Sequence, residues 1–142
     1  MPFGDYEVTI HRPATDVFDT IADGAQNTRW RASVVEVSLV SGDGGVGTVW
    51  HQVLRGRRRA QWDADYCVVA FDRPHVYGVE VVTGRSRGTF TYSLVEDAPG
   101  ETRVALHLAL TAHGAWRIIG GFLPREMGVE LDTLDRLRAL LA

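Results

Sequence analysis

The closing stretch of the chain most limits how the sequence can fold, because it predicts one long helix after a run of strands. Apolar side chains recur every three or four residues over residues 115–141, which is the spacing of a helix with one buried face. Earlier stretches alternate apolar and polar residues, which is the spacing of strands. This order predicts a curved sheet wrapped round a terminal helix, with a pocket for a small apolar molecule between them.

Seven strands are expected from the alternation, at residues 6–10, 34–40, 48–54, 60–71, 76–83, 88–95 and 103–112. Short turns join the last six, so we expect an antiparallel meander. In the last strand, one set of alternating residues should face the core: Val104, Leu106, Leu108 and Leu110.

Two helical segments are expected between the first and second strands. Pro13 fits the first turn of a helix, where its missing N–H costs little, and Val17, Phe18 and Ile21 then share one apolar face. Residues 25–30 predict a second short helix or turn, which Trp30 should anchor to the core.

The composition narrows the class of protein. A chain of 142 residues is long enough for a single core, so we expect one domain over residues 1–142. A net charge of -3 gives no general attraction to nucleic acid, and the single cysteine, Cys67, excludes an internal disulfide. No apolar stretch approaches the ~20 residues of a membrane span. The first residues lack the features of a signal peptide, so we expect a cytoplasmic protein.

Several short motifs, in their order and spacing, resemble one protein superfamily. They are Ile10 with PATDVF at 13–18, IAD at 21–23, Trp30, GVGT at 45–48, FDRP at 71–74, GETRV at 100–104 and the Leu-rich closing helix. Together they resemble the START/Bet v 1-like (SRPBCC) superfamily, and its polyketide cyclase/dehydrase-like branch. The resemblance implies an α+β helix-grip fold, in which a seven-stranded curved antiparallel sheet surrounds the C-terminal helix. It also implies a cavity that binds lipids, sterols, plant hormones, quinones or polyketides.

Aromatic and apolar residues on the inferred inner faces are the candidate ligand-binding residues. They are Trp62, Tyr66, Phe90, Tyr92, Trp116, Leu123 and Met127. The same residues can instead simply fill the core, and the sequence leaves that alternative open. It also leaves open whether Trp50 or His51 faces the cavity.

Catalytic residues are harder to find in the sequence. Glu130 lies at the edge of the apolar stripe of the closing helix, where a carboxylate inside a cavity would have a raised pKa and could exchange protons. We favour the alternative that it lies at the rim and reaches solvent. The five histidines form no HxH or HExxH pair, so we expect no metal, and no motif suggests a cofactor.

Three functions fit these patterns. The first is a non-catalytic binding or carrier protein for a small hydrophobic or amphipathic ligand such as a lipid, quinone or polyketide. The second is a polyketide cyclase or aromatase that uses the same cavity. The third is a protein-interaction module of the co-chaperone or toxin/antitoxin kind. Few ionisable residues fall on the inferred inner faces, which favours binding over catalysis.

Overall fold

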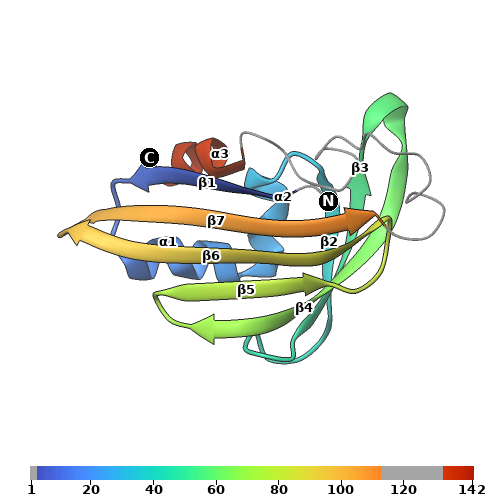
Figure 1. The fold of residues 1–142 in the computed structure, drawn as a ribbon, viewed down its shortest axis with the longest axis horizontal. Helices are drawn as coiled ribbons and strands as arrows, with labels where there is room; N and C mark the ends of the chain where they lie inside the picture. Colours follow the sequence, from blue (N-terminus) through green and yellow to red (C-terminus); the bar gives the residue numbers. More distant parts are fainter. Residues whose placement is uncertain (1–2, 113–132) are drawn as a thin grey trace.

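The sheet is a continuous antiparallel meander closed by the N-terminal strand. The computed structural model describes residues 3–112 and 133–142, in which the strand order is β1-β7-β6-β5-β4-β3-β2 (Figure 1). The strands are β1 (Phe3–Ile10), β2 (Val34–Ser41), β3 (Val49–Arg55), β4 (Gln61–Asp72), β5 (Val76–Val81), β6 (Ser86–Ala98) and β7 (Glu101–Ala112). The seven-stranded antiparallel sheet confirms the predicted fold class.

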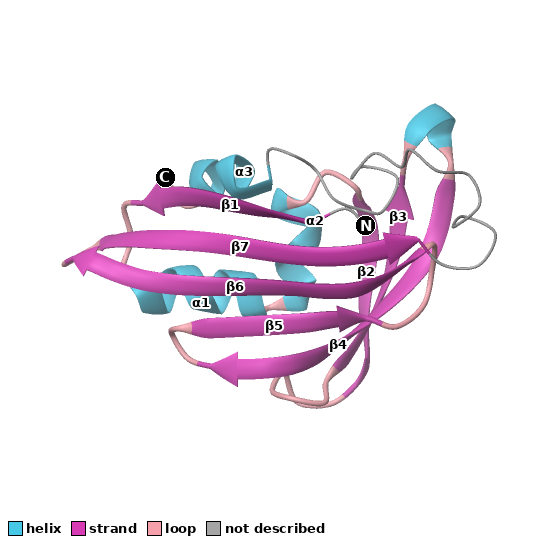
Figure 2. Ribbon diagram, in the orientation of Figure 1, coloured by secondary structure: helices cyan, strands magenta, loops and turns pink. Residues whose placement is uncertain are grey.

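Short helical segments lie beside this sheet (Figure 2). They are α1 (Ala14–Ala22), η1 (Gly24–Gln26), α2 (Asn27–Trp30), η2 (Arg57–Arg59) and α3 (Thr133–Leu140). Pro13 occupies the N-cap of α1, one position before the first helical residue. The expected closing helix is described only from Thr133, where Leu134 and Leu137 are buried.

The core lies on the concave side of the sheet, between the strands and the helices. Val104, Leu106 and Leu108 of β7 are buried, as the alternation predicts. Val17, Phe18 and Ile21 of α1 are also buried and belong to the same cluster, as does Trp30. The two helical segments before β2 therefore pack their apolar side chains against the inner face of the sheet.

The hairpin between β6 and β7 is longer than the sequence predicts. Pairing continues to Ala98 and Glu101, which leaves only Pro99 and Gly100 in the turn. Gly100 has a φ of +74°, a conformation that glycine adopts at little cost. β6 therefore extends beyond the expected end at residue 95, with one register shift between Glu96 and Ala98.

Candidate functional site

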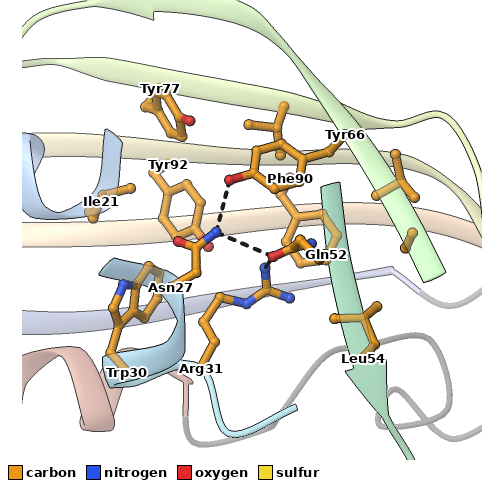
Figure 3. Close-up of a pocket in the computed structure, with 13 residues that line it drawn as sticks. Ile21, Asn27, Trp30, Arg31, Gln52, Leu54, Tyr66, Tyr77, Phe90 and Tyr92 are labelled. Atoms are coloured by element: carbon orange, nitrogen blue, oxygen red, sulfur yellow. Dashed lines mark hydrogen bonds between the residues drawn. The ribbon is translucent and has the colours of Figure 1, made fainter. Parts of the chain in front are cut away.

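A small cavity lies between the inner face of the sheet and the segment that joins α1 to β2 (Figure 3). Its volume of about 30 Å³ has room for a water molecule or two. Most lining residues are aromatic or aliphatic, with a few polar groups among them: Ile21, Asn27, Trp30, Arg31, Gln52, Leu54, Ala64, Tyr66, Tyr77, Val79, Val81, Phe90 and Tyr92.

The helical wall of the cavity comes from one short stretch of chain. Asp23 caps η1, its carboxylate accepting a hydrogen bond of 3.1 Å from the backbone N–H of Ala25. The following turns bring Asn27, Trp30 and Arg31 to the cavity. The opposite wall consists of alternating inward residues of β3, β4, β5 and β6.

Four buried polar side chains form a hydrogen-bonded row across the cavity, in the order Arg31, Gln52, Asn27 and Tyr66. Asn27 Nδ2 donates to Tyr66 Oη at 2.8 Å and to Gln52 Oε1 at 3.2 Å. Gln52 Oε1 also accepts from Arg31 Nη1 at 3.4 Å. The guanidinium of Arg31 lies 5.5 Å from the centre of the Phe90 ring, a favourable cation–π distance. Hydrogen bonding within the row stabilises polar groups that would otherwise be costly to bury.

Burial raises the pKa of two of the three described cavity tyrosines, so both phenols are protonated at neutral pH. It raises the pKa of Tyr66 to about 12, against the opposing effects of the Arg31 charge and the Asn27 hydrogen bond. Burial also raises the pKa of Tyr77, and the neighbouring Tyr66 and Tyr92 raise it further. Both hydroxyls are therefore available as hydrogen-bond donors.

Two polar atoms of residues that line the cavity are buried without a hydrogen-bond partner among residues 3–112 and 133–142. They are Trp30 Nε1 and Tyr77 Oη, which belong to lining residues that are 1% and 3% exposed; the lining itself does not place the indole nitrogen of Trp30 at the cavity. An unsatisfied buried polar atom destabilises a folded protein and is uncommon, so each one needs an explanation.

The structure brings together three of the predicted ligand-binding residues. Tyr66, Phe90 and Tyr92 all line the cavity. Trp62 is half-buried and does not line it within the described part of the chain. Its ring packs against a smaller cluster, and the guanidinium of Arg85 lies 4.0 Å from the ring centre. The remaining candidates, Trp116, Leu123, Met127 and Glu130, lie outside the described residues.

The sequence leaves open whether Trp50 or His51 of β3 faces inward. In the structure Trp50 faces the core and His51 faces the opposite side of the sheet. Trp50 is buried beneath Gly24 of η1, where an added Cβ would lie 2.5 Å from the indole ring. His51 is partly exposed, with Nδ1 2.5 Å from Asp65 and Nε2 3.6 Å from Asp63.

Sequence reasoning missed most of the polar row. Gln52 lies two residues from Trp50 and from Leu54, so alternation alone places all three on one face, and this signal was available. Tyr77 is not among the candidate ligand-binding residues, and Trp30 is expected only as an anchor to the core. Asn27 and Arg31 carry no such signal, because a short irregular helix has no reliable period.

The described residues contain no group of three or more His, Cys, Asp or Glu side chains that could hold a metal ion. None of the described helices is both long and apolar enough to cross a membrane.

Solved structures share this fold across nearly the whole chain. A START superfamily protein from Mycobacterium smegmatis has a TM-score of 0.79 at 11% identity, covering 98% of this chain and 96% of that one. Norcoclaurine synthase from Thalictrum flavum, a point mutant bound to a transition-state analogue, has a TM-score of 0.70 at 12% identity, covering 99% and 93%. The di-domain ARO/CYC BexL from the BE-7585A biosynthetic pathway has a TM-score of 0.70 at 16% identity. That match covers 98% of this chain but 50% of BexL. At these identities the similarity establishes the fold alone.

Sequence comparison identifies the family. A search of curated proteins finds no match. A model of the family described as polyketide cyclase/dehydrase and lipid transport matches residues 4–141. Together with the likeness in fold to a START superfamily protein, this match confirms the predicted resemblance. The chain belongs to the polyketide cyclase/dehydrase and lipid transport family, within the START/Bet v 1-like superfamily.

Proposed function

We propose that this protein binds a small, mostly apolar molecule carrying a polar group, in the cavity between the sheet and the α1–β2 connection. The observation that carries the proposal is the lining itself, in which aromatic side chains surround the buried row of Arg31, Gln52, Asn27 and Tyr66. Ligand sites in proteins combine an apolar wall with a few fixed polar groups in this way. The family's description, which includes lipid transport, supports the same proposal.

The chemistry of the lining favours binding over catalysis. Within the described part of the chain, no Asp, Glu, His or Cys lines the cavity. General acid–base catalysis needs a group whose pKa lies near the working pH, and the pKa of Tyr66, at about 12, is far above it. A cyclase mechanism would therefore need a residue such as Glu130, which remains a prediction from the sequence.

The size of the cavity sets a requirement on any ligand. An engineered cavity of about 150 Å³ is known to hold benzene, whereas this cavity measures about 30 Å³. Even a single aromatic ring must therefore displace lining side chains when it enters. Small single-ring molecules are the first probes to use.

The test is native mass spectrometry of the freshly purified protein, followed by denaturing extraction of any bound molecule. Ala64→Leu adds bulk to the cavity wall, and Ala105→Leu adds the same bulk to a half-buried residue of β7 that does not line the cavity. We expect a bound small molecule in the wild type and in Ala105→Leu, and its loss from Ala64→Leu. Circular dichroism would show whether both variants fold, since overpacking costs about 1–3 kcal/mol.

Two results would contradict the proposal. One is a bound molecule retained equally by both variants. The other is a wild-type protein that purifies empty and whose melting temperature no apolar probe raises. The second result would favour the protein-interaction alternative.

A further inference from the structure

The hydrogen-bonding groups that line the cavity are mostly donors. Asn27 uses both amide hydrogens, one toward Gln52 and one toward Tyr66. Gln52 Oε1 already accepts from two donors, Asn27 and Arg31. The amide oxygen of Asn27 is thus the one acceptor in this row that no described group engages.

Tyr66 has a hydrogen left to donate. Its oxygen accepts from Asn27, so its own hydroxyl hydrogen must point away from that amide. Among residues 3–112 and 133–142, no side chain or carbonyl accepts this hydrogen. Because the phenol stays protonated at neutral pH, it remains a donor under all ordinary conditions.

Tyr77 presents a second hydroxyl to the same space. Its oxygen is buried, lines the cavity and has no partner among the described residues. Figure 3 shows the hydroxyl groups of Tyr66 and Tyr77 directed toward the same part of the cavity. The influence of Tyr66 on the pKa of Tyr77 agrees with their proximity.

We infer that the cavity selects a neutral ligand with a carbonyl oxygen, which accepts hydrogen bonds from Tyr77 and Tyr66 while apolar atoms contact the aromatic wall. A carbonyl oxygen has two lone pairs, so it can accept from both phenols at once. No described carboxylate lines the cavity to compete for these donors. This inference rests on the proposed function and adds the chemical class of the ligand.

A matched set of probes tests the inference. Acetophenone and α-methylstyrene have nearly the same shape, but the first carries a carbonyl oxygen where the second carries a CH₂ group. Dissociation constants would be measured by titration calorimetry for the wild type, Tyr77→Phe and Tyr6→Phe. Tyr6 is a partly buried tyrosine of β1 that does not line the cavity, so it serves as the control.

We expect Tyr77→Phe to weaken acetophenone binding about tenfold, which is what one lost hydrogen bond commonly costs. The same variant should leave α-methylstyrene binding within about twofold of the wild type, since the hydroxyl gives a hydrocarbon no partner. Tyr6→Phe should change neither constant. Tyr66→Phe provides a second, independent variant with the same expected preference.

The possible failures are distinguishable. If Tyr77→Phe and Tyr66→Phe change both probes equally, the carbonyl inference is wrong while the cavity remains a binding site. If neither probe binds the wild type, the proposed function fails and the inference fails with it. If benzoate binds much more tightly than acetophenone and responds to Tyr77→Phe, the ligand is an acid, and the neutral carbonyl class is wrong.

Discussion

Two of the three described cavity tyrosines, Tyr66 and Tyr77, differ in what their hydroxyl groups do in the folded protein. Tyr66 Oη accepts a 2.8 Å hydrogen bond from Asn27, whereas Tyr77 Oη has no partner among the described residues. Removing the first hydroxyl leaves a buried amide hydrogen without an acceptor, and removing the second takes away an unsatisfied group. The same chemical change at the two positions should therefore have opposite effects on stability.

We predict that Tyr66→Phe lowers the free energy of unfolding by about 1–3 kcal/mol and that Tyr77→Phe raises it by about 1 kcal/mol. Urea denaturation of the ligand-free protein, monitored by circular dichroism, measures both values. A destabilisation of Tyr77→Phe equal to that of Tyr66→Phe would show that the Tyr77 hydroxyl already has a partner.

For single residues, the sequence predicted the aromatic members of the cavity lining better than the polar ones. Tyr66, Phe90 and Tyr92 were found because strand alternation places every second residue on one face. The Asn27–Tyr66 hydrogen bond joins residues 39 positions apart, and no local pattern in the chain indicates such a pair. The polar row therefore becomes visible only when the connection after α1 is placed against the sheet.

Among the elements, α1 is tied to the turn between β4 and β5 by one bidentate ion pair. Arg73 Nε and Nη2 donate to the two carboxylate oxygens of Asp19 at 2.7 and 2.8 Å. This hydrogen bonding lowers the pKa of Asp19 from its ordinary value of 3.8. The unfolded chain then binds a proton more readily than the folded one, so the stabilisation is present above about pH 4 and is lost as the pH falls further.

We predict that Arg73→Gln is less stable than the wild type at pH 7, and that the difference shrinks as the pH falls through the region below 3.8. Urea denaturation at pH 7 and pH 3 measures the change. Both side chains are about half exposed, so the effect should be small and should weaken with added salt. A difference that persists in an Asp19→Asn background would mean that Arg73 acts through other contacts.

Gly24 allows η1 to lie directly on the sheet. A Cβ at this position would lie 2.5 Å from the ring of Trp50, a distance that requires the indole or the turn to move. We predict that Gly24→Ala lowers the free energy of unfolding by about 1–3 kcal/mol through overpacking. Thermal and urea unfolding measure this value.

Gly45→Ala is the matched control for that substitution. Its Cβ would contact only a carboxylate oxygen of Asp43, at 3.3 Å, on a side chain that can move away. The control should stay within about 0.5 kcal/mol of the wild type. Equal losses from the two variants would show that the contact with Trp50 is not the cause.

The sequence predicted the order of the elements but not the local irregularities of the strands. The register of β4 against β5 shifts between Val68 and Ala70, which marks a β-bulge. Strict alternation would place Phe71 on the same face as Cys67, yet its ring packs edge-on against Phe18 of α1 at 5.2 Å. A bulge adds one residue to a strand and so reverses the faces beyond it. Nothing in the local pattern of apolar residues marks where that happens.

For the whole molecule, binding inside the folded core must also stabilise the fold. A ligand that binds only the native state at 100 times its dissociation constant adds about 2.7 kcal/mol to the free energy of unfolding. We predict this increase for acetophenone, with no increase for Ala64→Leu at the same concentration. Urea denaturation with and without the probe gives the value. A much smaller increase would indicate that the probe binds the surface or the unfolded chain.

The sequence was most informative about the arrangement of the whole fold. Six alternating stretches joined by short turns, after a first strand and two helical segments, leave few arrangements other than a meander. The family match over residues 4–141 agrees with that order. The identity of the ligand was out of reach, because it depends on where single hydrogens point inside a cavity. Fold and function are specified at different levels of detail.

The helical wall of the cavity has a consequence for how such proteins diversify. Asn27, Trp30 and Arg31, which supply that wall with its polar and aromatic groups, lie within five consecutive residues of the α1–β2 connection. None of them contributes a backbone hydrogen bond to the strand ladders of the sheet. Under the proposed function, substitutions in this stretch would alter which molecule is recognised without changing the pairing of the strands. A library restricted to Asn27, Trp30 and Arg31 tests this, because it changes the helical wall of the cavity and leaves the strands as they are.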